Sequence, residues 1–325
     1  MNSQECKYPT RLREPADPSP RLEPVIHSRN HHRWDGPLDE VSLSRYERDG
    51  YLWFEGFFSH DRIQPFFEEL VEISNDDELM RSDLVIQDPK SGRIRSVFDM
   101  HRISERFDKL TRDLRILGMV RQLLGSEVYI HQSRINDKFG FDGSGFQWHS
   151  DFETWHAEDG MSDMRAVSAS IMLTANDEFN GPLMLIPGSH HYFIPCVGET
   201  PRNNWVHSLE RQDTGIPDKH TLSMLAQRGG IQAPKGPAGS LLLFECNTLH
   251  ASNENMSPWP RSNLFFVYNS VDNVLHAPYA APTPRPNHLG NRRDVAALQM
   301  HDDFPELAGQ GVPQLRHAEQ WLRDG

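Results

Sequence analysis

The chain has 325 residues, of which 37% are hydrophobic and 24% are charged. This composition excludes an intrinsically disordered polymer, a coiled coil and a collagen-like fibre. Acidic residues outnumber basic ones by 46 to 33, and the formal net charge of −13 argues against nucleic acid or an anionic membrane as the main partner. A chain of this size can bury a core without a metal or a disulfide, so any metal site is expected to serve chemistry.

Cysteine usage and hydropathy predict the compartment. Cys6, Cys196 and Cys246 are scattered and form no Cys-x-x-Cys pair, which is typical of free thiols in a reducing environment. The chain has no apolar stretch like a signal peptide, and no run approaches the ~18 apolar residues of a membrane span. We therefore expect a soluble cytoplasmic protein with no membrane partner and no disulfides.

The first part of the chain predicts an arm followed by a helical flank. Residues 1–37 are rich in proline and lack apolar periodicity, so we expect a flexible arm, disordered or laid over the body, with little chemistry. The pattern then predicts a short helix from Ser42 to Asp49 and a strand from Tyr51 to Phe54. A further helix is expected to begin after a cap at Ser59 and to reach about Ile73.

A long helix from about Ser104 to Leu124 is predicted next, and Gly125 ends it. Its apolar residues recur at spacings of three and four: Phe107, Leu110, Leu114, Leu117, Val120 and Leu124. Beyond it the period changes to two. The candidate strands are Val128 to Asn136, Met164 to Thr174, Leu183 to Ile186, Ser240 to Glu245 and Ser262 to Ser270.

Helices first and strands afterwards predict a mainly β fold with flanking helices, built on a double-stranded β-helix, that is, a jelly-roll or cupin-like core. We assign residues 38–285 to this single domain and residues 286–325 to a polar tail, with one weakly helical stretch near 317–322. A long insertion at about 197–231 interrupts the strands, and loops of that length often act as lids or interaction elements.

A candidate metal site lies in the strand region. His149 and Asp151 are two residues apart, so in an extended chain their side chains share one face. His250 follows the strand that ends at Glu245. Two histidines and one carboxylate form the facial triad that holds non-haem Fe(II) and leaves positions open for catalysis. With 17 histidines in the chain, a His-x-Asp pair alone is weak support for a site.

Arg261 strengthens this interpretation. It lies eleven residues after His250, at the start of the next strand, where a guanidinium could bind a carboxylate through two parallel hydrogen bonds. Ser252 could add a hydroxyl to the same carboxylate. A metal triad beside a carboxylate clamp is the arrangement needed to hold a 2-oxo acid as a chelate on iron.

The strands around the triad carry unusual polar faces. By the two-residue rule Gln132, Arg134 and Asn136 share one face of a strand, and His131, Ser133 and Ile135 share the other. Solvent exposure would explain a single polar face. The last strand has a mixed face too, however, composed of Arg261, Asn263 and Phe265, which favours a binding cavity inside the barrel.

Five sequence motifs stand out in the middle of the chain: Trp148–His156 (WHSDFETWH), Glu158–Met161 (EDGM), Met164–Ala166 (MRA), Phe179–His190 (FNGPLMLIPGSH) and Cys196–Pro201 (CVGETP). Together they resemble the ectoine hydroxylase family, in the phytanoyl-CoA dioxygenase branch of the Fe(II)/2-oxoglutarate oxygenases. The likeness covers about residues 24–292. It implies a cupin-like β-helix, Fe(II), 2-oxoglutarate and O2 as cofactor and co-substrates, and hydroxylation of ectoine to 5-hydroxyectoine, a compatible solute of salt-stressed cells. It also implies a homodimer.

The resemblance assigns roles to individual residues. The implied iron ligands are His149, Asp151 and His250. The implied 2-oxoglutarate positions are Arg261, Ser252, Asn136 and Phe146. The implied ectoine pocket comprises Gln132, Trp155, Phe244, Phe265, Arg134 and Asn263. Glu245 and Ala251 depart from the Asp and Gly of the family beside the third ligand.

Two alternatives remain open at this point. The same chemistry could act on another small zwitterion, such as a proline or betaine derivative. A cupin-like protein could also bind a metal or a solute without turnover, although Arg261 at its clamp spacing argues against this interpretation.

Overall fold

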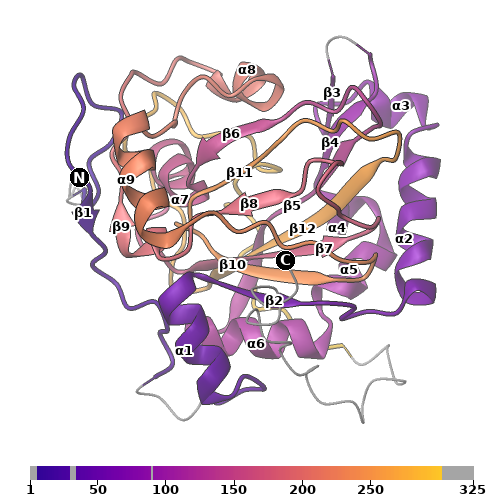
Figure 1. Cartoon of the computed structure of the whole chain (residues 1–325), viewed down its shortest axis with the longest axis horizontal. Coiled ribbons are helices and arrows are strands. Elements are labelled where there is room, and N and C mark those ends of the chain that lie inside the picture. Colours follow the sequence, from indigo (N-terminus) through magenta and orange to yellow (C-terminus); the bar gives the residue numbers. More distant parts are fainter. Residues whose placement is uncertain (1–5, 30–33, 89–90, 302–325) are drawn as a thin grey trace.

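Two antiparallel sheets form the centre of the computed structural model, which describes residues 6–29, 34–88 and 91–301 (Figure 1). Within these ranges the larger sheet has, in spatial order, β2 (Tyr51–Phe54), β10 (Leu241–Glu245), β7 (Ala166–Met172), β12 (Arg261–Ser270), β5 (Val128–Lys138), β4 (Ile94–Phe98) and β3 (Val85–Gln87). The smaller sheet has β6 (Phe146–His149), β11 (His250–Ser252) and β8 (Leu183–Leu185). The predicted jelly-roll core is confirmed.

Alternation along β12 divides the interior into two compartments. Leu264, Phe266 and Tyr268 join the apolar core that the larger sheet shares with the helices. Arg261 and Phe265 point the other way and line a cavity between the sheets. The period of two therefore places one face of this strand against helices and the other against the cavity.

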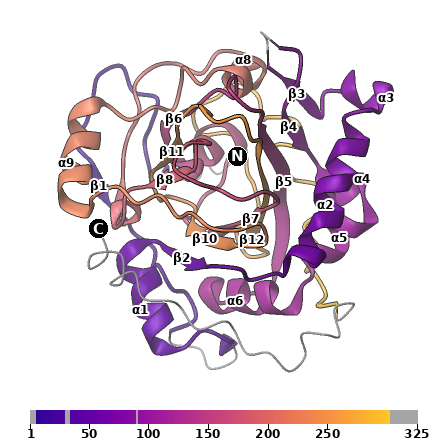
Figure 2. The ribbon, with the colours of Figure 1, turned by 45° about the vertical axis from the view of Figure 1, so that its right-hand side comes forward.

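Helices cover the outer face of the larger sheet (Figure 2). The helix α6 (Leu114–Leu124) packs against β5, β7 and β12. The expected single helix from Ser104 to Leu124 is wrong, because α5 (Glu105–Thr111) ends before Asp113. The Asp113 carboxylate accepts hydrogen bonds from the backbone of Arg115 and Ile116 and so begins a new helix. The apolar spacing continues across this break, which is why periodicity alone missed it.

The remaining helices of the first half are short connectors and flanks. The predicted helix ending at Asp49 is present as α1 (Glu40–Asp49), which the Asp39 side chain caps and Gly50 ends at φ +79°. The other three are α2 (His60–Ile73), α3 (Asp77–Met80) and α4 (Met100–Ile103). Ser59 precedes α2 as expected, but its side chain makes no capping hydrogen bond.

The described part of the N-terminal arm lies over the body. Its strand β1 (Ser19–Pro20) pairs with β9 (Tyr192–Phe193), which follows the 3-10 turn η3 (Ser189–His191). Tyr8 is only 1% exposed. At the other end, packing continues past residue 285, since Leu289 is fully buried. The expected helical stretch near 317–322 lies outside the described residues.

The insertion at about 197–231 contains two helices, α8 (Asn204–Glu210) and α9 (Lys219–Gly229). Ser208 and Leu209 of α8 reach the cavity between the sheets. The insertion therefore covers part of the cavity. Within the described ranges, no helix combines the length and the apolar character needed to cross a bilayer.

We predict that His190 makes folding sensitive to acid. The side chain is fully buried, and burial, together with the charges of His191 and Arg21, lowers its pKa to about 3. As the pH falls, His190 is therefore protonated in the unfolded chain before it is protonated in the folded protein. The contribution of neutral His190 to the free energy of unfolding is complete above about pH 6.5. It is lost as the pH falls toward 3, by up to about 2 kcal/mol at pH 5.

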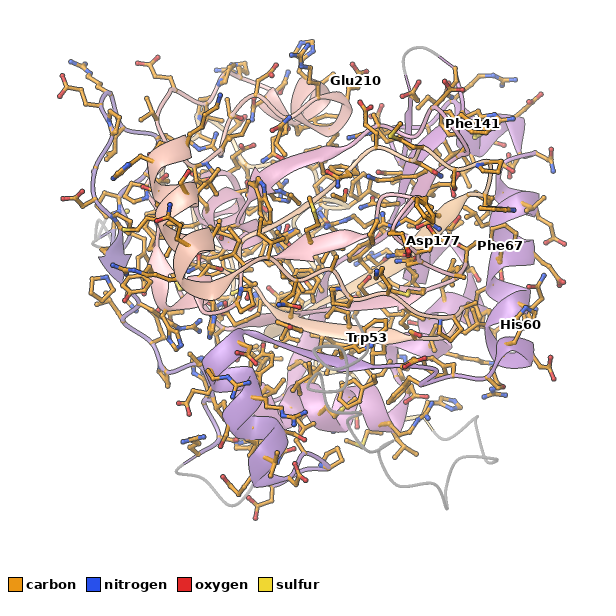
Figure 3. All side chains as sticks on the ribbon, in the orientation of Figure 1. Trp53, His60, Phe67, Phe141, Asp177 and Glu210 are labelled. Carbon is orange, nitrogen blue, oxygen red and sulfur yellow. The ribbon has the colours of Figure 1, made fainter. Side chains whose placement is uncertain are left out.

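The test is urea unfolding at pH 7.5 and pH 5. The free energy of unfolding should fall less with acid in His190→Gln than in the wild type. His60→Gln is the control, because that side chain is exposed at the start of α2 (Figure 3). An unchanged pH dependence in His190→Gln would contradict the prediction.

Candidate active site

Pairing between two short strands brings the candidate metal ligands together. His250 of β11 lies directly opposite His149 of β6, and their ring centroids are 4.2 Å apart. Directly after β6, Asp151 begins the short helix α7 (Asp151–Thr154), which the Ser150 side chain caps. Its carboxylate oxygens lie 3.9 Å from Nε2 of His149 and 3.8 Å from Nε2 of His250. The three residues form a group that could hold a metal ion, with candidate ligand atoms all within 4.8 Å of one another.

Hydrogen bonds orient both imidazoles toward a common point. Nδ1 of His149 lies 2.7 Å from the carbonyl oxygen of Gln147, and Nδ1 of His250 lies 3.0 Å from that of Thr248. Each Nδ1–H therefore donates to the backbone and leaves Nε2 with a free lone pair. This is the arrangement that histidine ligands adopt in metal sites.

The electrostatics favour the metal-binding forms of all three side chains. Burial, reinforced by His250, lowers the pKa of His149 to about 3, and burial also lowers the pKa of His250. Burial alone would raise the pKa of Asp151, but His250 and Arg134 outweigh it and lower that pKa. The histidines are thus neutral and the aspartate ionised near neutral pH. Oδ2 of Asp151 is buried with no hydrogen-bond partner, as expected of an atom that awaits a cation.

The triad opens into the cavity between the sheets, together with most of the other residues implied by the sequence. Those that line it are Gln132, Arg134, Asn136, Phe146, His149, Asp151, Trp155, His250, Ser252, Arg261 and Phe265. Residues from both sheets, from α7 and from the insertion contribute to its wall. Most of the side chains that the two-residue period placed on the polar strand faces therefore do lie around one cavity.

Buried cations gather at one side of the cavity: Arg261 lines its wall, whereas Lys138 and Arg95 lie behind wall residues. Arg261 is 1% exposed, burial lowers its pKa to about 10, and its Nε has no hydrogen-bond partner. Nζ of Lys138 donates to Oγ of Ser252 at 2.8 Å, and burial lowers its pKa well below the usual value. The guanidinium of Arg95 lies 4.0 Å from the ring centre of Phe146. Because desolvation of the charged forms is the main cause of these shifts, a bound anion would stabilise this side.

The other side combines aromatic faces with polar groups. Trp155 begins a π-helical turn (Trp155–Asp159) that continues α7, and such turns occur often at functional sites. The guanidinium of Arg134 lies 4.9 Å from the ring centre of Phe265 and donates to the side chain of Gln132. This wall could accept a small ligand that carries both a delocalised cation and an acid group.

Two of the implied pocket residues do not line the cavity. Phe244 is fully buried, and its ring centroid lies 5.0 Å from that of His250, so it packs behind the third ligand. Asn263 is also buried, and one polar atom of its amide lies 3.2 Å from Nη2 of Arg261. Both residues support neighbours that do line the cavity.

A β-bulge changes the expected faces of β5. The register between β5 and β12 shifts where Gln132 pairs with Val267 and Ile130 pairs with Tyr268. His131 therefore lies against Trp155, with ring centroids 4.9 Å apart, instead of sharing a face with Ser133 and Ile135. Because of the extra residue, two successive side chains, those of His131 and Gln132, point toward the site. The two-residue rule could not predict this.

Ala251, noted from the sequence beside the third ligand, also lines the cavity. Several other wall residues were missed from the sequence: Ser96, Phe98, Thr154, Glu158, Leu183, Ser208, Leu209, Gln212, Thr214 and Arg285. Arg285 lies in the region expected to be a boundary, and it pairs with the fully buried Asp159. No periodicity marks it. Thr154 and Glu158 flank Trp155, so helical proximity was the one signal available for these two.

Comparison with known proteins agrees with this geometry. The family model of phytanoyl-CoA dioxygenase (PhyH) matches residues 46–263. The ectoine dioxygenase of Halomonas elongata is 51% identical over 291 residues, covering 89% of this chain and 87% of the relative. That of Sphingopyxis alaskensis is 45% identical over 295 residues, covering 90% of this chain and 95% of the relative.

Solved structures show the same likeness. The crystal structure of EctD from S. alaskensis with 2-oxoglutarate and 5-hydroxyectoine has a TM-score of 0.82 at 42% identity, covering 91% of this chain and 98% of that one. The nogalamycin carbocyclase SnoK is 17% identical with a TM-score of 0.61 and covers 81% of this chain and 95% of its own, a likeness of fold alone. The chain belongs to the phytanoyl-CoA dioxygenase family and, within it, to the ectoine dioxygenases.

Proposed function

We propose that this chain hydroxylates ectoine to 5-hydroxyectoine, with Fe(II) as cofactor, and that 2-oxoglutarate and O2 are consumed while succinate and CO2 are released. The observation that carries the proposal is the His149–Asp151–His250 group beside the buried guanidinium of Arg261. A metal triad and an anion site that share one cavity suit this class of oxygenase. The similarity to the ectoine dioxygenases of H. elongata and S. alaskensis supports the choice of substrate.

His149, Asp151 and His250 would hold the iron. The two Nε2 atoms and the unpartnered Oδ2 of Asp151 fit a cation. Among the described residues this group offers three protein ligands, which leaves positions open for substrates. When bound, the iron, with 2-oxoglutarate and O2, supplies the oxidation that inserts one oxygen atom into a substrate C–H bond. The protein contributes position and exclusion of water.

Arg261, Ser252 and Asn136, with Phe146 against them, would hold 2-oxoglutarate. The unpartnered Nε of Arg261 fits one carboxylate of this dianion, and bidentate binding would fix its direction. We add Lys138 to this set, because its ammonium already donates to Ser252. A dianion would offset the desolvation of both cations.

Trp155 and Phe265 would hold ectoine, which carries a delocalised amidinium and a carboxylate. Their faces suit the amidinium, whereas the cations Arg134 and Arg285 line the same cavity and suit the carboxylate. Gln132 adds a polar group, with Phe244 and Asn263 acting from behind the wall. The backbone of Leu209, in the insertion, accepts a hydrogen bond from Arg95 at 3.1 Å, so the insertion would shield this site from water.

The cellular setting belongs to the same proposal. Three free cysteines and a net charge of −13 suit a cytoplasmic enzyme. We infer that it works as a homodimer in compatible-solute metabolism, as the family likeness implies. Sedimentation of the purified chain would test the dimer directly.

The first test of the function is turnover of ectoine. The purified chain with Fe(II), 2-oxoglutarate, O2 and ectoine should yield a product heavier by the mass of one oxygen atom, together with succinate. Mass spectrometry checks both. Parallel reactions with proline and betaine derivatives are the comparison, and turnover of one of these instead of ectoine would overturn the choice of substrate.

We predict that Asp151→Asn abolishes ectoine-dependent succinate formation. The change removes the anionic ligand while keeping its shape, so iron should be held weakly by two histidines. Asp177→Asn is the matched control, because Asp177 accepts hydrogen bonds within its own turn and does not line the cavity. Turnover near the wild-type rate in Asp151→Asn would refute the assignment of ligands.

We predict that Lys138→Met raises the KM for 2-oxoglutarate by about tenfold or more and changes the KM for ectoine much less. A hydrogen bond to a charged group contributes about 1.5–3 kcal/mol, and about 1.4 kcal/mol corresponds to a factor of ten. Steady-state kinetics with each substrate varied in turn measures the split. Lys219→Met, which changes an exposed lysine at the start of α9, serves as control. An unchanged KM for 2-oxoglutarate would remove Lys138 from the co-substrate site.

A further inference from the structure

The N-terminal arm, residues 6–29, is fixed beside the segments that carry the metal ligands. Its strand β1 pairs with β9, and Leu12 forms a parallel bridge with Val197. Arg11 of the arm pairs with Glu153 and Glu158, which follow Asp151 in the chain, and all three side chains are at most 3% exposed. These contacts hold the arm in register, so that its other side chains meet fixed partners.

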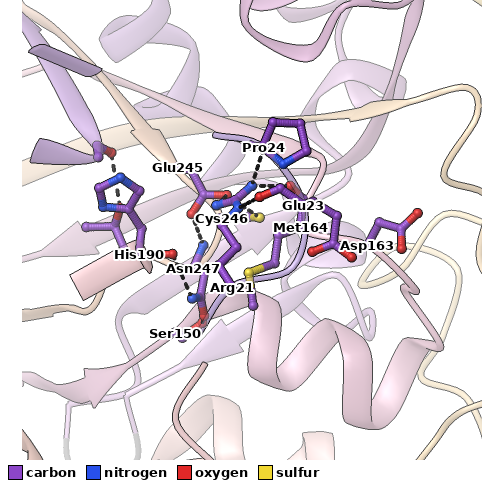
Figure 4. Close-up of polar contacts among 12 residues, drawn as sticks. Arg21, Glu23, Pro24, Ser150, Asp163, Met164, His190, Glu245, Cys246 and Asn247 are labelled. Atoms are coloured by element: carbon purple, nitrogen blue, oxygen red, sulfur yellow. Dashed lines mark hydrogen bonds and ion pairs between the residues drawn. The ribbon is translucent and has the colours of Figure 1, made fainter. Parts of the chain in front are cut away.

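Arg21 of the arm makes a buried ion pair with Glu245, the last residue of β10. Nη1 of Arg21 lies 2.7 Å from Oε1 of Glu245, and the two side chains are 4% and 2% exposed. The other guanidinium donors reach the backbone carbonyls of Glu23, Pro24 and Met164 (Figure 4). Removal of one partner would leave the other charge buried and unpaired.

The ion pair continues into the segments that bear the ligands. Oε2 of Glu245 accepts a hydrogen bond from the backbone N–H of Asn247 at 2.6 Å. Oδ1 of Asn247 in turn accepts one from Oγ of Ser150 at 2.8 Å (Figure 4). Ser150 stands between His149 and Asp151, and Asn247 precedes His250 by three residues. The chain of contacts therefore joins both ligand-bearing segments and ends at the arm.

We propose that Arg21 is a positioning residue of the metal site and that the arm acts as a strap on it. Through Glu245, Arg21 fixes the Asn247 backbone, and Asn247 holds Ser150, so that the His149–Asp151 segment and His250 keep their mutual geometry. Groups that orient metal ligands from behind commonly affect metal affinity by about 10- to 100-fold. Arg21 touches no ligand itself and has no part in the chemistry.

The proposal rests on the proposed iron site and competes with a plainer role, in which the Arg21–Glu245 pair supports the fold alone. The two roles predict different effects of removing both charges. Replacing the buried pair by neutral side chains can restore stability, but it does not restore the tether from the arm to Glu245. Stability and iron affinity should then separate.

The experiment measures anaerobic Fe(II) binding to the metal-free full chain, together with the melting temperature of each variant. The variants are Arg21→Met, Arg21→Lys and the double change Arg21→Met with Glu245→Gln, in which the amide oxygen can still accept from Asn247. Arg115→Met is the matched control. Arg115 is a buried arginine that pairs with Asp113 at 3.4 Å in the outer helical layer, away from the cavity.

We expect Arg21→Met to raise the dissociation constant for Fe(II) by about tenfold or more. The double variant should regain most of the melting temperature but keep the weak iron binding. Arg21→Lys, which keeps the charge but loses the fork, should fall between Arg21→Met and the wild type. Arg115→Met should lower the melting temperature without weakening iron binding.

Two results would overturn the proposal: unchanged Fe(II) affinity in folded Arg21→Met, or a double variant that recovers affinity along with stability. Failure of the wild-type chain itself to bind Fe(II) would instead refute the proposed function. The two failures are therefore distinguishable.

Discussion

The site depends on the register between β6 and β11. Because His149 and His250 are paired across these strands, their imidazoles meet over one face, and Asp151 follows at the next turn of the chain. A slip of one residue would turn one histidine to the opposite face and dissolve the triad. The carbonyl groups that orient both Nδ1 atoms come from the same short segments, so register and ligand direction are set together.

Buried cations surround the cavity. Arg261 lines the side expected to receive the co-substrate, Lys138 and Arg95 lie behind that side, and burial disfavours the charged forms of all three. Beside them, His250 and Arg134 lower the pKa of Asp151. Buried charges of this kind destabilise the fold when no ligand compensates them, and binding of a dianion and a divalent cation offsets that cost. The same groups therefore lower the stability of the protein and make its binding specific.

The sequence was sufficient for the parts of the site that obey a simple period. The spacing of His149 and Asp151 and the alternation through Arg261 and Phe265 predicted convergence on one cavity, and in the structure all four residues line the same cavity. It was insufficient where a local feature interrupts the periodic pattern. Two examples are the helix cap formed by Asp113 and the β-bulge that turns His131 inward. Contacts between distant segments, such as those of Arg21 and Arg285, depend on tertiary packing and leave no periodic signal.

The proposed chemistry requires that His149, Asp151 and His250 hold iron within reach of 2-oxoglutarate. Visible absorption during anaerobic addition of Fe(II) to the chain with 2-oxoglutarate present measures this arrangement without turnover. We expect a broad charge-transfer band that saturates at stoichiometric iron and disappears in His250→Ala. A solution that stays colourless, or a band of full intensity in His250→Ala, would contradict the proposed site.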